Sequence, residues 1–216
     1  LIDAIEDLGV LDDTLVFYIV GDNGASGEGT LNGSFNEMFL FNGAAALETP
    51  EFMASHIDDF GGPTAYNHFA VGWAHAMDTP YQWTKQVASH WGGTRNGMVV
   101  HWPARIAARG EVRTQFHHVI DLVPTILEAA GLPAPTTVNG IPQMPLHGTS
   151  LAYTYDDAAA PDRRTTQYFE CFVNRGIYHE GWTACTIHGI PWILTGDSPP
   201  FDDDVWELYA PDDWSQ

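Results

Sequence analysis

The apolar residues at the start of the chain have the spacing of a helix and then give way to a continuous apolar run. Gly9 is placed to end this first helix, one face of which carries Leu1, Ile2, Ile5 and Leu8. Residues 15–20, LVFYIV, are typical of a buried strand because strand-forming apolar residues follow one another without interruption. The opening of the chain therefore predicts a helix that leads into a buried strand.

The pattern after this strand predicts further helices and a second strand. Short helices are expected over residues 36–47 and 50–59, the second with Thr49 as its N-cap. Residues 60–83 mix glycine, proline and aromatic residues without a clear period, which favours a long functional loop or a collar around a site. A second buried strand over residues 98–102 and a helix over residues 122–130 follow.

Strands that alternate with helices predict an α/β fold, with a mainly parallel sheet covered by helices. Beyond about residue 160 the pattern changes to close-spaced strand candidates joined by short turns, at residues 166–173, 176–179 and 182–187. This spacing is typical of an antiparallel meander. We therefore expect two domains, an α/β domain over residues 1–157 and a small antiparallel subdomain over residues 158–216.

Polar side chains follow the first predicted strand directly, in the sequence Gly21-Asp22-Asn23-Gly24. In open α/β sheets, ligands bind beyond the carboxyl ends of the strands. Asp22 and Asn23 offer carboxylate and amide oxygens, which are the donors that Ca²⁺ or Mg²⁺ prefers. The alternative is a plain turn, since Asp-Asn-Gly is also ordinary turn chemistry.

Three segments in a fixed order carry a resemblance to a known family. Residues 22–26 read DNGAS, residues 72–80 read GWAHAMDTP, and residues 85–103 read KQVASHWGGTRNGMVVHWP. In this combination they resemble the second half of bacterial arylsulfatases, members of the sulfatase family with alkaline-phosphatase-like topology. The resemblance implies that residues 1–157 are the C-terminal half of a sulfatase catalytic core and that residues 158–216 are a truncated C-terminal subdomain.

The resemblance also implies roles for individual residues. In the family, Ca²⁺ or sometimes Mg²⁺ is held in part by an Asp-Asn pair after a strand, which Asp22 and Asn23 match. A lysine in this half of the core contacts the sulfate group, and Lys85, the only lysine in the chain, is its counterpart. A surface position is the alternative for Lys85. His90 is a candidate proton donor or hydrogen-bond partner, with a structural or supporting role as the alternative.

The sequence does not contain the family's nucleophile motif. Family members carry a Cys or Ser, with Pro two residues later and Arg two further, and oxidise it to formylglycine, whose hydrate attacks sulfur. Residues 171–175, CFVNR, have the Cys and Arg spacing, but Val173 replaces the proline and the segment lies after the DNG motif rather than before it. We therefore expect the formylglycine in an N-terminal half outside this chain, and a buried strand position for Cys171.

The composition excludes some partners and leaves the compartment open. With 28 acidic and 8 basic residues, the formal charge of −20 argues against nucleic acid or an anionic membrane surface as a partner. An anionic substrate requires a local region of positive charge in this acidic chain, which Lys85 and a bound dication would supply. No segment approaches the ~20 consecutive apolar residues of a membrane span. The two cysteines, Cys171 and Cys185, either pair across a hairpin or stay free, and they do not fix the compartment.

These features predict a metal-assisted sulfate ester hydrolase of the arylsulfatase type that acts on a small sulfate ester. We expect the chain to be inactive alone, because it carries only part of the metal site and lacks the nucleophile segment. The closest alternative is a phosphonate monoester or phosphodiester hydrolase of the same superfamily. The alternative from another class is an acidic module that binds Ca²⁺ or sulfated glycans without turnover.

Overall fold

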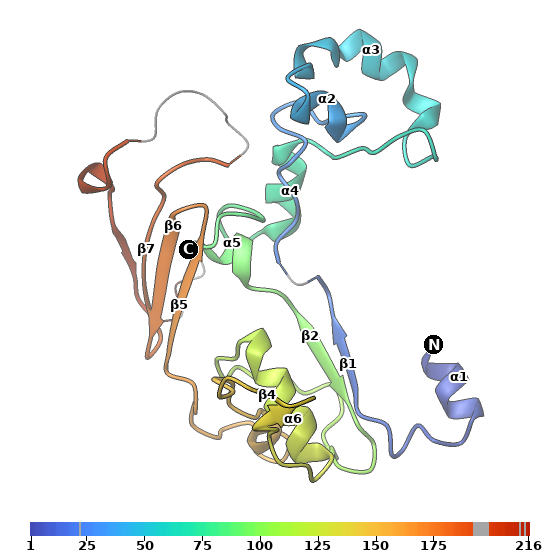
Figure 1. Cartoon of the computed structure of the whole chain (residues 1–216), viewed down its shortest axis with the longest axis vertical. Helices are drawn as coiled ribbons and strands as arrows, with labels where there is room; N and C mark the ends of the chain where they lie inside the picture. Colours follow the sequence, from blue (N-terminus) through green and yellow to red (C-terminus); the bar gives the residue numbers. More distant parts are fainter. Residues whose placement is uncertain (22, 192–198, 212, 214) are drawn as a thin grey trace. The chain divides into compact units, whose positions relative to one another are not determined.

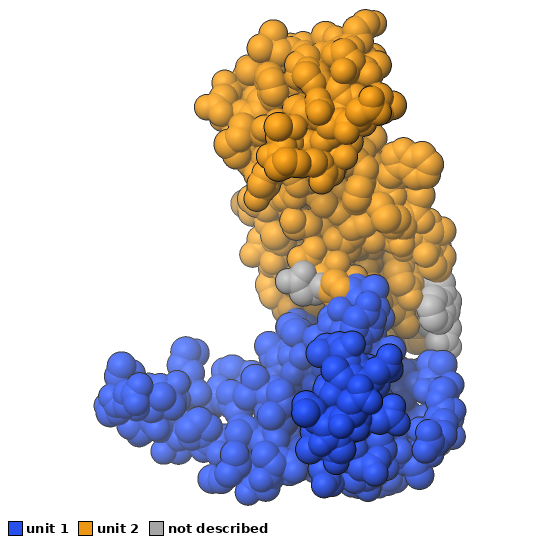
Figure 2. Space-filling view, turned by 90° about the vertical axis from the view of Figure 1, so that its right-hand side faces the viewer, with its two compact units in different colours: residues 1–20, 97–167 blue, residues 21–96, 168–216 orange. Residues whose placement is uncertain are grey.

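The computed structural model describes residues 1–216 except 22, 192–198, 212 and 214. The chain forms two compact units, each built from two separate stretches of sequence (Figure 2). Unit 1 consists of residues 1–20 and 97–167, and unit 2 of residues 21–96 and 168–216. These units follow contacts in space, and the expected division between residues 157 and 158 stays a prediction.

Unit 1 contains the predicted first helix and both predicted strands. Helix α1 (Ile2–Asp7) ends before Gly9, which has a positive φ of 70°. Strands β1 (Val16–Ile19) and β2 (Met98–His101) lie side by side (Figure 1) and pair antiparallel. The parallel arrangement that we expected is therefore wrong for this pair, because an apolar run predicts a strand but is equally compatible with either direction of pairing.

In the rest of unit 1, polar contacts surround a short helical segment. Helix α6 (Leu122–Ala129) follows the 3₁₀ turn η3 (Val119–Asp121), and Gly131 after it has the positive φ of a C-cap, as predicted. The side chain of Asp121 is fully buried and accepts hydrogen bonds from Arg164 and from the backbone of Thr149. The remaining elements are β3 (Thr137–Val138), β4 (Ile141–Pro142) and η4 (Ala152–Thr154).

The first stretch of unit 2 is helical, with the predicted helices divided into shorter pieces. Residues 36–47 form α2 (Glu37–Phe41) and η1 (Ala45–Leu47), and residues 50–59 form α3 (Pro50–Ser55) and η2 (Ile57–Asp59). The Thr49 side chain accepts a hydrogen bond from the Phe52 backbone, as expected for an N-cap.

The prediction of a loop over residues 60–83 is wrong for its central part, which forms α4 (Val71–Asp78). Only Ala74 of this helix is buried, while Trp73 and Met77 are exposed. A helix that buries so little has no apolar stripe, and hydrophobic periodicity therefore cannot reveal it. A one-turn helix, α5 (Trp91–Thr94), follows later in unit 2.

The C-terminal sheet has the order β5-β6-β7-β8 and confirms the predicted antiparallel meander (Figure 1). Its strands are β5 (Thr166–Cys171), β6 (Asn174–His179), β7 (Trp182–Thr186) and β8 (Glu207–Tyr209), with η5 (Phe201–Asp203) before β8. Phe172 and Val173, which we expected at the end of the first strand, form the turn between β5 and β6 instead. Both have a positive φ, of 49° and 60°, as in a type I′ hairpin turn.

Candidate functional site

Gly24 and Ala25 lie backbone to backbone against residues 85–93, the lysine segment. The Lys85 N–H donates to the Ala25 carbonyl at 3.0 Å, and the Gly24 N–H donates to the Gly93 carbonyl at 3.3 Å. A Cβ on Gly24 would lie 1.7 Å from the Gly92 carbonyl oxygen, so only glycine permits this approach. The DNG motif and the lysine segment, which are far apart in sequence, therefore meet in unit 2.

Of the predicted metal pair, Asp22 lies outside the described residues, and Asn23 is half-buried beside Gly24. Asp78, which the sequence analysis did not single out, lies against the backbone of Ala25, directly after the DNG motif. Its Oδ1 accepts a hydrogen bond from the Ala25 N–H at 2.9 Å. Its Oδ2 is buried and has no hydrogen-bond partner among the described residues. Burial raises the pKa of Asp78, and the Ala25 N–H and His75 offset only part of this effect.

Lys85 is oriented by a carboxylate that the sequence analysis also missed. Its Nζ lies 3.1 Å from Glu28 Oε2, and the lysine side chain is about one-third exposed (34%). Ser26 Oγ donates to the same carboxylate oxygen at 2.7 Å, and Gln86 Nε2 donates to the other at 2.8 Å. Burial acts to raise the pKa of Glu28, but the hydrogen bonds from Ser26 and Lys85 outweigh it and lower the pKa. Glu28 is thus a fixed anion that holds the ammonium group in place.

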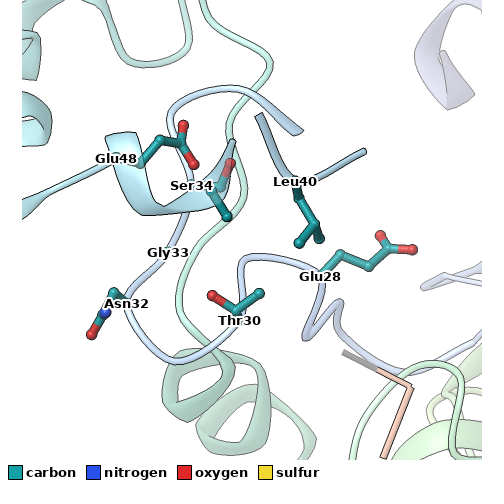
Figure 3. Close-up of a pocket in the computed structure, with 8 residues that line it drawn as sticks. Glu28, Thr30, Asn32, Gly33, Ser34, Leu40 and Glu48 are labelled. Atoms are coloured by element: carbon teal, nitrogen blue, oxygen red, sulfur yellow. The ribbon is translucent and has the colours of Figure 1, made fainter. Parts of the chain in front are cut away.

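Glu28 and its neighbour His68 each line a pocket on the surface of unit 2. Glu28 lines a small pocket of about 50 Å³ and lies across it from Ser34 and Glu48 (Figure 3). His68 Nδ1 lies 3.9 Å from Glu28 Oε2, and its Nε2 lies 2.9 Å from Glu37 Oε2. His68 lines a second, larger pocket of about 260 Å³, together with Asn32, Met53, Phe60, Phe69 and Trp73.

His90 is buried, with 1% of its surface exposed, on the side of its segment that packs against the C-terminal sheet. Its Nδ1 lies 2.9 Å from Ser89 Oγ, and its Nε2 lies 3.3 Å from Glu207 Oε2. The Cys185 sulfur is 3.6 Å from the same Nε2. Burial lowers the pKa of His90 more than the hydrogen bond to Glu207 raises it, so the ring is neutral at pH 7.

Both cysteines are free thiols in the structure. Cys171 is half-buried at the end of β5, and the Arg175 that follows at the family's spacing lies across the hairpin turn on β6. Burial, and then the adjacent Glu170 carboxylate, raise the pKa of the Cys171 thiol. Because the attacking group of the family is a formylglycine hydrate and not a thiol, the rejection of Cys171 for that role still rests on the missing proline and on the order of the motifs.

Comparison with known proteins gives the family of the chain. A family model described as Sulfatase matches residues 1–132. An uncharacterized sulfatase of Schizosaccharomyces pombe is 26% identical over 137 residues, which are 62% of this chain and 22% of the relative. A solved structure of BT4656 in complex with its substrate D-glucosamine-2-N,6-O-disulfate is similar over 55% of this chain and 22% of that chain, with 21% identity and a TM-score of 0.38.

The family model covers more than half of the chain, and the chain therefore belongs to the sulfatase family. The matched part of the chain spans 22% of the length of each of these two relatives. Within the part of the chain that the structure describes, no helix has the length and apolar character needed to cross a membrane.

Proposed function

We propose that this chain is part of a sulfate ester hydrolase and contributes metal ligands and a sulfate-binding lysine to its active site. One observation carries the proposal: the backbones of Gly24, which ends the DNG motif, and of Ala25 directly after it are hydrogen-bonded to Gly93 and Lys85 of the lysine segment. Side chains that the family uses for the metal and for the sulfate thus originate from adjoining backbone. The membership of the sulfatase family supports the same reaction class. The finer assignment, to an arylsulfatase with alkaline-phosphatase-like topology, rests on the sequence resemblance.

The residues around the DNG motif fit a hard cation such as Ca²⁺, with Mg²⁺ as the alternative. Asp22 and Asn23 would be the principal ligands. The second oxygen of Asp78 is buried without a hydrogen bond among the described residues, and a buried carboxylate oxygen without a partner is costly unless a positive charge compensates it. We therefore add Asp78 to the candidate ligands. A bound dication would neutralise part of the charge of a sulfate group at this place.

Lys85 is proposed to contact the sulfate group. Its ammonium group is partly exposed, and its ion pair with Glu28 fixes the position from which it reaches an anion. A preorganised positive charge stabilises the negative charge that develops on oxygen during ester cleavage. For His90, we favour the supporting role over that of proton donor, because its ring is buried against Ser89, Cys185 and Glu207.

The larger pocket is proposed to receive the leaving group of the ester. It shares His68 with the cluster around Glu28, and its walls include the exposed rings of Phe69 and Trp73. Aromatic rings and a few polar groups are typical of small-molecule sites. An aryl or sugar alcohol would fit such a pocket. The attacking formylglycine is proposed to come from a part of the enzyme outside these 216 residues.

The test uses the intact enzyme and replaces the lysine and its neighbour separately. Lys85→Ala should lower the turnover of an aryl sulfate by roughly 10²-fold or more, as loss of a preorganised charge contact does. Gln86→Ala is the matched control, because Gln86 also binds Glu28 but carries no charge. This variant should keep its turnover within a few fold. Wild-type turnover of Lys85→Ala would return Lys85 to a surface role.

The same assay separates the alternatives. A phosphonate monoester or phosphodiester hydrolase would turn over the corresponding aryl phosphorus ester faster than the aryl sulfate. A non-catalytic module would bind Ca²⁺ or a sulfated glycan in the intact protein and hydrolyse neither ester. The chain on its own should hydrolyse none of them, and it should bind Ca²⁺ weakly, because Asp22, Asn23 and Asp78 supply fewer than the six or more oxygens, roughly, of a complete shell.

A further inference from the structure

A second cluster of metal-ligating side chains lies in unit 2, formed by His90, Cys185 and Glu207. The three residues come from three places in the sequence, the segment before α5, strand β7 and strand β8. One ligand atom from each lies within 4.8 Å of the others. Neither the sulfate contact nor the cation proposed above uses any of them. We propose that His90, Cys185 and Glu207 form a site for a zinc-like transition metal.

The distances agree with tetrahedral coordination. Metal–sulfur and metal–nitrogen bonds of about 2.3 and 2.0 Å at a tetrahedral angle put sulfur and nitrogen about 3.5 Å apart, and nitrogen and oxygen about 3.3 Å apart. The observed separations from His90 Nε2 are 3.6 Å to Cys185 Sγ and 3.3 Å to Glu207 Oε2. Two of the three pairs thus already have the spacing that one shared ion requires.

The third pair, Cys185 and Glu207, can close through Glu207, which is the one exposed ligand of the three. His90 and Cys185 are buried with 1% and 0% of their surface exposed, whereas half of the Glu207 side chain is exposed (50%). The exposed side of Glu207 also gives the ion a path from solvent. Three protein ligands and one open position are typical of zinc sites that bind water or a small ligand.

Neighbouring side chains support the ligands in the orientation that a metal needs. Ser89 Oγ lies 2.9 Å from His90 Nδ1 and can accept a hydrogen bond from the Nδ1–H, which leaves the Nε2 lone pair facing the cluster. Tyr209 donates a hydrogen bond of 2.5 Å to Glu207 Oε2. Metal-ligating histidines and carboxylates are commonly held by such outer hydrogen bonds.

The cluster selects a different class of ion from the DNG motif. A thiolate and an imidazole suit Zn²⁺ and related metals, and Ca²⁺ prefers oxygen ligands alone. Burial, and then the Glu207 carboxylate, raise the pKa of Cys185 to about 12, so the thiol is protonated without metal. On binding, the S–H bond breaks, the proton leaves to solvent and the thiolate sulfur bonds to the ion. No oxidant or reductant takes part.

The test is a Co²⁺ titration of the 216-residue chain, because a cobalt–thiolate bond gives a charge-transfer absorption band that carboxylates alone do not give. The band should saturate at one equivalent, disappear when one equivalent of Zn²⁺ is added, and persist in excess Ca²⁺. A wild-type chain without the band overturns the proposal. This readout requires no sulfatase activity, so the proposed function and the metal site can fail independently.

The two cysteines provide a matched pair of variants. Cys185→Ser should abolish the band, whereas Cys171→Ser should leave it unchanged, since Cys171 lies at the far end of β5 beside the hairpin turn. A band that survives Cys185→Ser, or that is lost in Cys171→Ser, overturns the proposal. Glu207→Gln changes an exposed ligand without loss of volume and keeps the experiment decisive if Cys185→Ser fails to fold. Ser89→Ala, which removes an outer hydrogen bond, should weaken Co²⁺ binding by about 10- to 100-fold, and Glu207→Gln, which removes the charge of a ligand, should weaken it by at least as much.

Discussion

The contact between the DNG motif and the lysine segment depends on Gly24, which makes Gly24→Ala the most direct test of the site. An alanine Cβ would lie 1.7 Å from the Gly92 carbonyl oxygen and 3.1 Å from the Lys85 backbone nitrogen. Ordinary contact begins at 3.4 Å, so the backbones must separate by 3.4 − 1.7 = 1.7 Å. The obstructing atoms belong to the backbone, and no side chain can rotate away to make room.

The magnitude follows from this geometry. Extra methyl groups in packed interiors typically cost about 1–3 kcal/mol, and the rigid neighbours here place Gly24→Ala at about 3 kcal/mol or above. A displacement of this size would also move Lys85 relative to the metal ligands. Misplacement by about 1 Å can lower turnover by roughly 10²-fold. We therefore expect the intact enzyme to lose activity even where it stays folded.

Urea unfolding of the 216-residue chain and aryl sulfate turnover by the intact enzyme measure the two effects. Gly72→Ala is the control, because a Cβ on this helical glycine meets nothing within 4 Å. It should stabilise the chain by about 0.5–1 kcal/mol, since alanine is the better helix former. Wild-type stability and turnover of Gly24→Ala would refute the contact and, with it, the geometry on which the proposed function rests.

Three further predictions concern stability, each measured by chemical unfolding. Asp121→Asn should lower the free energy of unfolding by about 3–5 kcal/mol, because it leaves the nearly buried Arg164 without its charge partner. Asp156→Asn, in the exposed ion pair with Arg105, should lower it by about 1 kcal/mol or less. Equal effects of the two substitutions would contradict this difference. Phe172 and Val173 both have a positive φ, a conformation that Asn-Gly adopts more easily, so replacing them by Asn-Gly should stabilise the hairpin by about 1 kcal/mol. Destabilisation would show that the two side chains contribute packing instead. Burial lowers the pKa of His90 in the folded chain below its ordinary value of 6.5, so the unfolded chain binds that proton more tightly. The free energy of unfolding should therefore fall as the pH drops below 6.5. His90→Gln should reduce this pH dependence, and an unchanged dependence would assign it to other groups.

Local features of the sequence predicted local features of the structure. Capping, turn residues and periodicity within a few neighbouring positions predicted the helix that begins after Thr49, the helix that ends before Gly131 and the antiparallel meander. The order of short motifs likewise predicted the sulfatase family. The helix ends and the meander can be predicted because the interactions that produce them connect residues close in the chain.

The partners of the site residues could not be predicted in this way. Glu28 reaches Lys85 across 57 positions, and His90 meets Cys185 and Glu207 across 95 and 117 positions. The antiparallel direction of β1 and β2 depends in the same way on the path of the intervening chain. Periodicity and capping carry no information about that path. The sequence by itself therefore determined most of the helices and strands and the family, whereas only the tertiary structure decided which carboxylate orients Lys85 and which side chains gather around His90.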